Sequence, residues 1–415
     1  MGMTITEKIF ARAVGASSVK PGQIVTVKPD AVIMQDATGV MTFYLFRELG
    51  MPVVIPEKVH MFTDHYCPPG NLDNAEKQRQ SEDFCRDFNI PGLHNMQGIS
   101  HQIMVEGIVK PGRIYLGADS HTTTYGALGA FSTGIGSSEF CAVAATGELW
   151  LKVPESIRIT VKGKVPAKVT SKDIILKLLK DIGANGGTYK AMEFCGQTIS
   201  DLSIDSRLTI CNMSLEGGAK NAIVAPDEKT IAYMESLGVA RNEYEVFASD
   251  ADASYCREIE MDVSSLEPYV AVPYSPANGV PVGDVAGIPL NQILFGACTN
   301  GRLEDMKILA DTLKGKKVKH GLRMLVFPGS NKIMADSARL GYLEILANAG
   351  CTIGPASCGA CGIQNPLTDG ENCLATNNRN FRGRMGSPKS NTYVASPETA
   401  AASALTGVIT DPRTI

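Results

Sequence analysis

The chain has 415 residues, more than one ordinary hydrophobic core organises, so roughly 100 to 200 residues per domain predicts two to four domains. Charged residues make up 20% and hydrophobic residues 44% of the chain, as in globular proteins, and the formal net charge of -4 disfavours a nucleic-acid or anionic-membrane surface. No signal peptide opens the sequence and no run of about 18 apolar residues occurs in it, so we expect a soluble, cytoplasmic protein.

Strand-like and helix-like segments alternate along the chain, which predicts an α/β fold. The strand-like runs, rich in β-branched residues, are 23–30, 51–57, 113–119, 156–163, 207–213, 291–300 and 322–330. The helix-like runs are 42–50, 138–152, 303–315 and the segment from 396 onward. Changes of pattern near 151–156 and a segment rich in Pro and Gly at 264–284 predict three domains, 1–153, 154–268 and 269–415.

Glycine is abundant, with 41 residues, but it does not form a nucleotide-binding loop. The segment GANGGTYK at 183–190 does not match the P-loop pattern, and GIGSSE at 134–139 has glutamate where a dinucleotide fingerprint has its third glycine. Tight turns around a helix start explain the second segment equally well.

Histidine is clustered in the sequence. Five of the six histidines lie between residues 60 and 121, namely His60, His65, His94, His101 and His121. Asp64 precedes His65, and Asp119 and Ser120 precede His121, each pair at the expected end of a strand. A capped turn would account for either pair alone. Two such pairs in one region favour a proton-handling or metal site.

Eleven cysteines, an odd number spread over the chain, do not form a disulfide framework. Cys358 and Cys361 make a C-x-x-C pair, and Cys298 follows a predicted strand. Structural zinc and a redox dithiol both remain possible from this spacing. An iron–sulfur cluster is a third possibility, with one iron open if only these three thiolates bind it and with Cys351 or Cys373 as alternative fourth ligands.

Eight segments occur in an order that resembles the aconitase superfamily over essentially the whole chain. They are MQDATG, TDHYC, SHQIMVEG, GADSHTTTYGALGA, TICNMSLEGGA, GACTNGRLED, SCGACG and TNNRNFRGRMG. Among family members the chain is most similar to the separate large subunits of the isopropylmalate isomerase and homoaconitase type, which lack the swivel domain. The resemblance implies three α/β/α domains around a central iron–sulfur cleft.

The resemblance also implies functions for individual residues. Cys298, Cys358 and Cys361 would hold a 4Fe-4S cluster with one open iron. Three carboxylate–histidine pairs would handle protons: Asp64 with His65, Asp119 with His101, and Glu216 with His121. The residues expected to contact substrate or cluster are Gln35, Ser120, Asn212, Asn378, Arg379 and Arg384.

The implied reaction is elimination and re-addition of water on a hydroxy di- or tricarboxylate, with 3-isopropylmalate and 2-isopropylmalate as the expected pair. The family's catalytic base lies on the swivel domain, so we expect a small partner subunit to supply it. Isopropylmalate-type large subunits usually read His-Asp where this chain reads Gln35–Asp36. Homoaconitate, 2,3-dimethylmalate and aconitase-like substrates therefore stay open, as does a different class of function, an iron or oxygen sensor that binds RNA.

Overall fold

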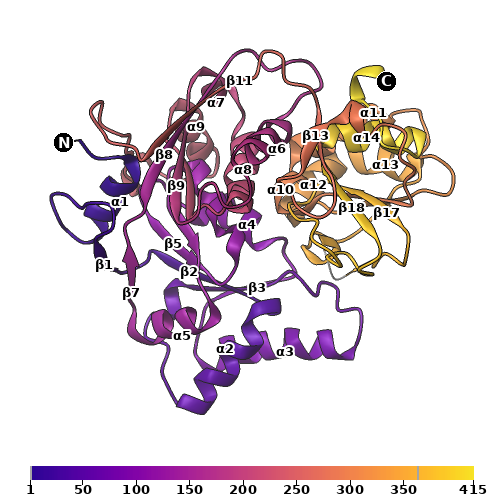
Figure 1. Cartoon of the computed structure of the whole chain (residues 1–415). Helices are drawn as coiled ribbons and strands as arrows, with labels where there is room; N and C mark the ends of the chain where they lie inside the picture. The colour runs from indigo at the N-terminus through magenta and orange to yellow at the C-terminus, as the bar shows by residue number, and fades with distance from the viewer. Residues whose placement is uncertain (1, 362–363) are drawn as a thin grey trace. The chain divides into compact units, whose positions relative to one another are not determined.

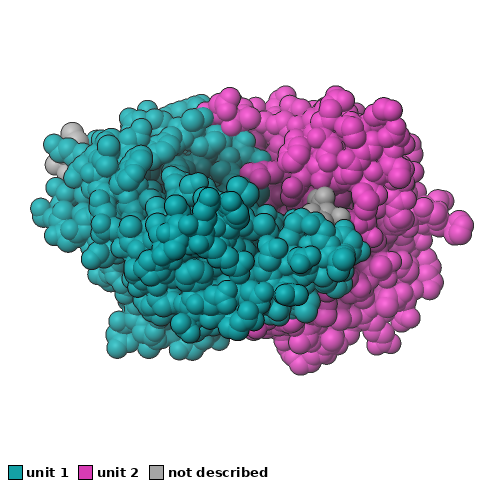
Figure 2. Space-filling view, turned by 90° about the horizontal axis from the view of Figure 1, so that it is seen from below, with its two compact units in different colours: residues 1–96, 103–162, 187–261 teal, residues 97–102, 163–186, 262–415 magenta. Residues whose placement is uncertain are grey.

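The computed structural model describes residues 2–361 and 364–415, except for the side chain of Ala360. Contacts group the chain into two compact units, coloured separately in Figure 2. Unit 1 comprises residues 1–96, 103–162 and 187–261, and unit 2 comprises 97–102, 163–186 and 262–415. Across the described ranges, no helix is both long and apolar enough to span a membrane.

A five-stranded parallel sheet and a two-stranded antiparallel sheet form one part of unit 1. The five-stranded sheet has the order β4-β3-β2-β5-β6. Its strands are β2 (Ala31–Gln35), β3 (Val59–Thr63), β4 (Gly92–Asn95), β5 (Ile114–Gly117) and β6 (Phe131–Gly134), and the smaller sheet pairs β1 (Ile24–Val27) with β7 (Leu149–Lys152).

Helices pack against this sheet because their apolar faces share its core. Figure 1 shows α2, α3 and α5 along one side of β2 and β3, and phenylalanines of α2 and α3 stack on one another. The helical segments of this region are α1 (Ile5–Ala13), α2 (Asp36–Leu49), η1 (Pro56–Lys58), α3 (Leu72–Asp87), η2 (Met104–Ile108), η3 (Ser120–Leu128) and α5 (Ser137–Thr146). Between α3 and η2 the chain forms α4 (Ser100–Ile103), which belongs to unit 2 except for its last residue.

The other part of unit 1 is built on a four-stranded sheet of order β10-β9-β8-β11. Its strands are β8 (Glu155–Lys162), β9 (Lys190–Cys195), β10 (Asn221–Val224) and β11 (Arg257–Asp262). Its helical segments are α7 (Gln197–Asp201), α8 (Ile204–Met213), η4 (Ser214–Gly217), α9 (Glu228–Ser236) and η5 (Arg241–Glu243). Within unit 1, α8 and β10 pack against η3.

Unit 2 contains a seven-stranded sheet of order β13-β12-β18-β17-β14-β15-β16. Its strands are β12 (Tyr269–Ala271), β13 (Gly279–Pro281), β14 (Gln292–Phe295), β15 (Arg323–Val326), β16 (Thr352–Ile353), β17 (Asn372–Ala375) and β18 (Asn391–Ala395). Its helical segments are α6 (Ser171–Ile182), η6 (Val282–Asp284), α10 (Ala297–Asn300), α11 (Leu303–Leu313), α12 (Asn331–Arg339), α13 (Tyr342–Ala349), η7 (Gly359–Cys361), α14 (Pro397–Thr406) and η8 (Pro412–Thr414).

The α/β class predicted from the sequence is confirmed, and each large sheet takes its strands from one of the segments 1–153, 154–268 and 269–415. The division into three domains at those boundaries stays a prediction. Three stretches group differently from those segments. Residues 97–102 of the first segment, and residues 163–186 and 262–268 of the second, belong to unit 2 rather than to unit 1.

Two predicted elements are wrong, and a third is too long at its C-terminal end. Residues 51–57 form no strand, and Pro52 and Pro56 there lack the N–H groups that a ladder needs. Residues 207–213 are helical within α8, which Ser203 caps by accepting the N–H of Ser206. The predicted helix 138–152 ends at Gly147, whose φ of 78° breaks it before β7.

Candidate functional site

The five-stranded sheet has a topological switch point between β2 and β5. The chain proceeds from β2 to β3 and β4 on one side, and β5 and β6 lie on the other. Loops that leave the carboxyl ends of two such strands diverge and leave a crevice, where α/β proteins bind ligands. Asp36 directly follows β2, and Asp119 is the second residue after β5. Both carboxylates therefore lie at this edge of the sheet.

Asp36 ties the end of β2 to the loop that follows β3. Its two carboxylate oxygens accept the backbone N–H groups of His65 and Tyr66, each at 3.1 Å. Burial, and then the neighbouring Asp64 carboxylate, raise the pKa of Asp36 to about 6. Asp36 is therefore a buried anchor for the loop that carries His65.

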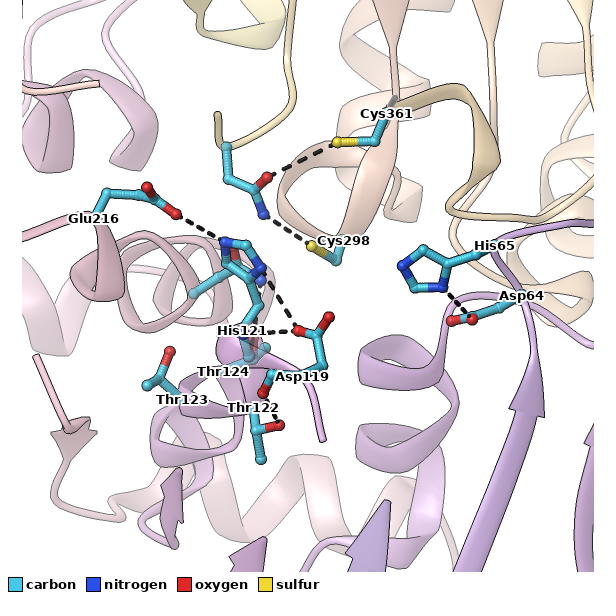
Figure 3. A network of polar contacts seen from close by, with 12 residues as sticks. Asp64, His65, Asp119, His121, Thr122, Thr123, Thr124, Glu216, Cys298 and Cys361 are labelled. Atoms are coloured by element: carbon cyan, nitrogen blue, oxygen red, sulfur yellow. Dashed lines mark hydrogen bonds and ion pairs between the residues drawn. The ribbon is translucent and has the colours of Figure 1, made fainter. Parts of the chain in front are cut away.

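His65 lies against two carboxylates. Its Nδ1 is 2.7 Å from Oδ1 of Asp64 and 3.8 Å from Oδ1 of Asp36, and 15% of its side chain is exposed (Figure 3). The Asp64 carboxylate orients the ring. The same three side chains could hold a cation, because one ligand atom from each lies within 4.8 Å of the others.

His121 is held by an acid from each of two segments. Its Nε2 is 2.9 Å from Oε1 of Glu216, and its Nδ1 is 3.6 Å from Oδ1 of Asp119, which also accepts the backbone N–H of His121 at 2.7 Å (Figure 3). Glu216 lies on η4, ninety-five residues further along the chain. These contacts fix the orientation of the imidazole ring, so the group is suited to transfer a proton at a defined position.

Three consecutive buried threonines fix the turn that follows His121. Thr122 donates to the carbonyl of Asp119 at 2.6 Å, and Thr124 donates to the carbonyl of His121 at 2.6 Å. Thr123 donates to the carbonyl of Cys211 at 3.0 Å, and the amide of Asn212 donates to Thr124 at 2.8 Å. These bonds attach the end of α8 to η3, so Asn212 and His121 belong to one rigid group.

The seven-stranded sheet of unit 2 has its own switch point, between β14 and β17. Cys298 lies at the carboxyl end of β14, on α10, and is buried. Gly296 makes the turn between them with a φ of 136°, and a Cβ there would lie 2.2 Å from the carbonyl oxygen of Phe327. The chain beyond β17 carries Asn378, Arg379 and Arg384, so these residues and Cys298 flank the same switch point.

Two of the predicted ligand sulfurs contact the same asparagine. Nδ2 of Asn378 donates to Sγ of Cys298 at 3.2 Å, and Sγ of Cys361 is 3.9 Å from Oδ1 of Asn378. A guanidinium nitrogen of Arg384 donates to Sγ of Cys361 at 3.4 Å. N–H donors to sulfur stabilise thiolates, so the pair is suited to bind a metal or a cluster. Figure 3 shows both cysteines pointing to one side chain.

Cys358 opens the turn that contains Cys361, and its carbonyl accepts the N–H of Cys361 at 3.0 Å. Gly362, which ends the SCGACG motif, and the following Ile363 lie outside the described residues.

The two alternative fourth ligands, Cys351 and Cys373, lie in apolar surroundings. Cys373 is buried within β17 in an apolar cluster, and Cys351 packs against the core under α13. Burial raises the pKa of each to about 12, which disfavours the thiolate.

A buried arginine connects the Cys298 turn to the segment that contains His101. The guanidinium of Arg302 donates to the carbonyls of Cys298 and Thr299 at 2.7 and 2.6 Å, and to Oε1 of Gln102 at 3.1 Å. Gly98 also forms a β-bridge with Ser330. These contacts explain why the buried His101 belongs to the same unit as the cysteines.

The remaining predicted residues occupy positions beside these groups. Gln35 is buried at the end of β2, Ser120 is half-buried at the start of η3, and Arg379 is half-buried after Asn378. The pairing of Asp119 with His101 joins residues of different units and stays a prediction. Sequence reasoning missed Asp36, Gln102 and Arg302 as anchors, although all three stand inside the segments MQDATG, SHQIMVEG and GACTNGRLED.

Comparison with known proteins agrees with this arrangement. A family model described as "Aconitase family (aconitate hydratase)" matches residues 7–287 and 283–407. The chain belongs to the aconitase family. The resemblance predicted from the ordered segments is thereby confirmed. The family places the chain among the hydro-lyases, and members of the aconitase family bind an iron–sulfur cluster.

Relatives that match over their full length share one name within the family. The chain is 44% identical to the 3-isopropylmalate dehydratase large subunit of Heliobacterium modesticaldum, over 100% of both chains. It is 44% identical to the 3-isopropylmalate dehydratase large subunit 1 of Pyrococcus furiosus, over 100% of this chain and 99% of that one. It is 45% identical to the 3-isopropylmalate dehydratase large subunit of Sulfurihydrogenibium sp., over 99% of this chain and 96% of that one.

A solved structure supports the fold assignment. The holo-form of aconitase X from Thermococcus kodakaraensis superposes with a TM-score of 0.50 and covers 93% of this chain and 89% of that chain. The two sequences are 16% identical, so the likeness concerns the fold alone.

Proposed function

We propose that this chain is the large subunit of a hydro-lyase that interconverts 3-isopropylmalate and 2-isopropylmalate, a step of leucine biosynthesis. The observation that carries the proposal is identity of 43% to 45% to chains named 3-isopropylmalate dehydratase large subunit, over 99% to 100% of this chain. The two carboxylate-paired histidines and the two sulfurs on Asn378 support it.

The cofactor proposed for unit 2 is a 4Fe-4S cluster held by Cys298, Cys358 and Cys361. The donor set fits the group, because Cys298 and Cys361 meet at one asparagine and Arg384 donates to a sulfur. When bound, the cluster supplies a Lewis acid for the substrate hydroxyl and carboxylate. Arg379 and Arg384 would neutralise substrate carboxylates, for which planar guanidinium groups are suited.

The histidines would handle the proton that leaves with the hydroxyl. Dehydration breaks a C–H and a C–O bond, a base takes the carbon-bound proton, and an acid protonates the departing hydroxyl as water. His121, between Glu216 and Asp119, and His65, beside Asp64, are the proposed acids. Rehydration at the adjacent carbon reverses the same transfers. We assign orienting contacts to Gln35, Ser120 and Asn212 and the third proton-handling pair to Asp119 with His101.

A small partner subunit is proposed to complete the enzyme. The relatives are named large subunits, which implies a second chain. In this proposal the partner is a swivel-domain subunit that supplies the base for the carbon-bound proton, so the large subunit alone is inactive and the working enzyme is a heterodimer or a multiple of one.

The test is a substrate panel with the anaerobically reconstituted large and small subunits. Isopropylmalate, homocitrate, citrate and 2,3-dimethylmalate would be compared by kcat/KM, each with the large subunit alone as control. We expect a preference for isopropylmalate and no turnover by the single chain. Preference for another acid would overturn the substrate assignment, and turnover by the single chain would overturn the requirement for a partner's base.

A further inference from the structure

Lys172 is a fully buried lysine whose three ammonium protons all have oxygen acceptors. Its side chain, on the first turn of α6, has 0% relative exposure. Nζ donates to Oδ1 of Asn300 at 3.1 Å, to the carbonyl of Thr376 at 2.8 Å and to the carbonyl of Asn377 at 2.7 Å. A neutral amine has only two protons and a lone pair. One of the three acceptor oxygens would then face that lone pair, which is unfavourable. The geometry therefore favours the charged form.

The acceptors lie on both sides of the switch point in unit 2. Asn300 ends α10, the turn that carries Cys298, whereas Thr376 and Asn377 follow β17. The hydroxyl of Thr299 also donates to the carbonyl of Thr376, at 2.5 Å. Asn378, the next residue, contacts the sulfurs of Cys298 and Cys361. Lys172 thus joins two diverging segments at the point where both reach the predicted ligands.

The surrounding charges explain how a buried ammonium is tolerated. Burial lowers the pKa of Lys172 to about 7, and Cys298, Asp305, Cys361 and Asp173 oppose that shift in this order. Asp305 also accepts the amide of Asn300 at 3.0 Å, so the lysine and this carboxylate share one hydrogen-bond network. A bound cluster with three thiolates would add negative charge near the ammonium.

The backbone that presents Lys172 is itself fixed. Asp173 accepts the N–H of Thr170 at 2.7 Å in a capping box, and its other oxygen accepts the N–H of Tyr269 on β12 at 2.8 Å. The start of α6 is therefore attached to the sheet. The ammonium on this rigid support can therefore fix the positions of the α10 turn and of the segment after β17.

We propose that Lys172 is a positioning residue for the cluster, holding the Cys298 turn and the Asn377–Asn378 segment together before the cluster binds and balancing its charge afterwards. This inference rests on the proposed function for the identity of the cofactor. The part of the inference that concerns the cluster-free chain is that Lys172 already holds the Cys298 turn against the Asn377–Asn378 segment. This part can be tested without the cofactor.

The first test is alkylation of the cluster-free full chain with iodoacetamide, followed by mass spectrometry of each cysteine. The variant Lys172→Met removes the charge and all three donors and keeps an unbranched side chain only one atom shorter. We expect the rate for Cys298, relative to that for Cys373, to rise about tenfold, because loss of the lysine contacts lets the Cys298 turn open locally more often. Cys373 reports global opening, because it is buried in the β17 strand.

The second test is the lifetime of the reconstituted cluster in air, followed through iron and acid-labile sulfide per chain. We expect the Lys172→Met cluster to be lost about tenfold faster than the wild-type cluster. Lys177→Met is the matched control, because Lys177 lies on the same helix and pairs with Asp181 on the surface. It should match wild type in both tests.

The outcomes separate this inference from the proposed function. If wild-type chain binds no iron–sulfur cluster, the proposed function fails, whereas the alkylation ratio still tests Lys172. An unchanged ratio, or an equal rise at Cys298 and Cys373, would overturn the inference, because the lysine would then matter only to global stability. If Lys172→Met does not fold, Asn300→Ala takes its place. This variant removes one acceptor of the ammonium and one donor to Asp305, and it should raise the ratio in the same direction.

Discussion

Oε1 of Glu216 lies 2.9 Å from Nε2 of His121, although the two residues are separated by 95 positions in the chain. The contact joins η4 to η3 within unit 1, and both side chains are largely buried, with 10% and 7% exposed. Because water competes weakly for two buried groups, the carboxylate fixes the orientation of the imidazole.

Glu216→Gln tests this contact. The amide keeps the size of the side chain but replaces the carboxylate by a weaker acceptor, which loosens the contact that orients His121. We therefore expect kcat of the reconstituted enzyme to fall about tenfold or more with a small change in KM. Glu228→Gln, on the first turn of α9 and exposed, is the matched control and should leave kcat unchanged. Equal rates for wild type and Glu216→Gln would show that the pair has no catalytic role.

Asp36→Asn tests the anchor of the His65 loop through pH. The pKa of Asp36 is raised by burial from 3.8 to about 6, so the folded chain binds the proton more tightly than the unfolded chain. Between about pH 4 and pH 6 this group makes the free energy of unfolding fall as pH rises, by at most about 3 kcal/mol. Asparagine does not titrate, so the thermal midpoint of wild type relative to the variant should decrease from pH 4.5 to pH 7.5. A constant or increasing difference would contradict the assignment.

Cysteine replacements test the ligand set. Cys298→Ser, Cys358→Ser and Cys361→Ser should each abolish cluster retention, measured as iron and acid-labile sulfide after anaerobic reconstitution. Cys351→Ser is the control, because that thiol packs against the core under α13 and its raised pKa disfavours a thiolate. Full iron content in any of the first three variants would identify a wrong ligand. Zinc without sulfide in the wild type would refute a cluster altogether.

Gly296→Ala tests the turn that exposes Cys298. A methyl group there would lie 2.2 Å from the carbonyl oxygen of Phe327, and the φ of 136° is unfavourable for alanine, so we expect a loss of about 2 kcal/mol or more and weak cluster binding. Gly315→Ala is a matched control with a φ of 71° and no atom within 4 Å of the added carbon. It should lose about 1 kcal/mol and bind the cluster normally. Thermal unfolding and iron content distinguish the two.

The sequence alone determined the family and the candidate cysteines. Motif residues such as Cys298 and Cys361 could be identified because their chemistry depends on residue type and on order along the chain. The α/β class also followed from local patterns, because strands and helices carry hydrophobic repeats of different period.

The tertiary structure decided what local pattern could not. Residues 207–213 are rich in strand formers yet belong to α8, where burial on several sides removes the one-sided periodicity that marks a surface helix. The contacts of Asp36 with the His65 loop, and of Lys172 with Asn300 and Asn377, join segments 29 to 205 residues apart. Parallel strands bring Asp36 and the His65 loop to one edge of a sheet, and packing of α6 brings Lys172 to the ends of α10 and β17. No local pattern in a single sequence encodes such contacts.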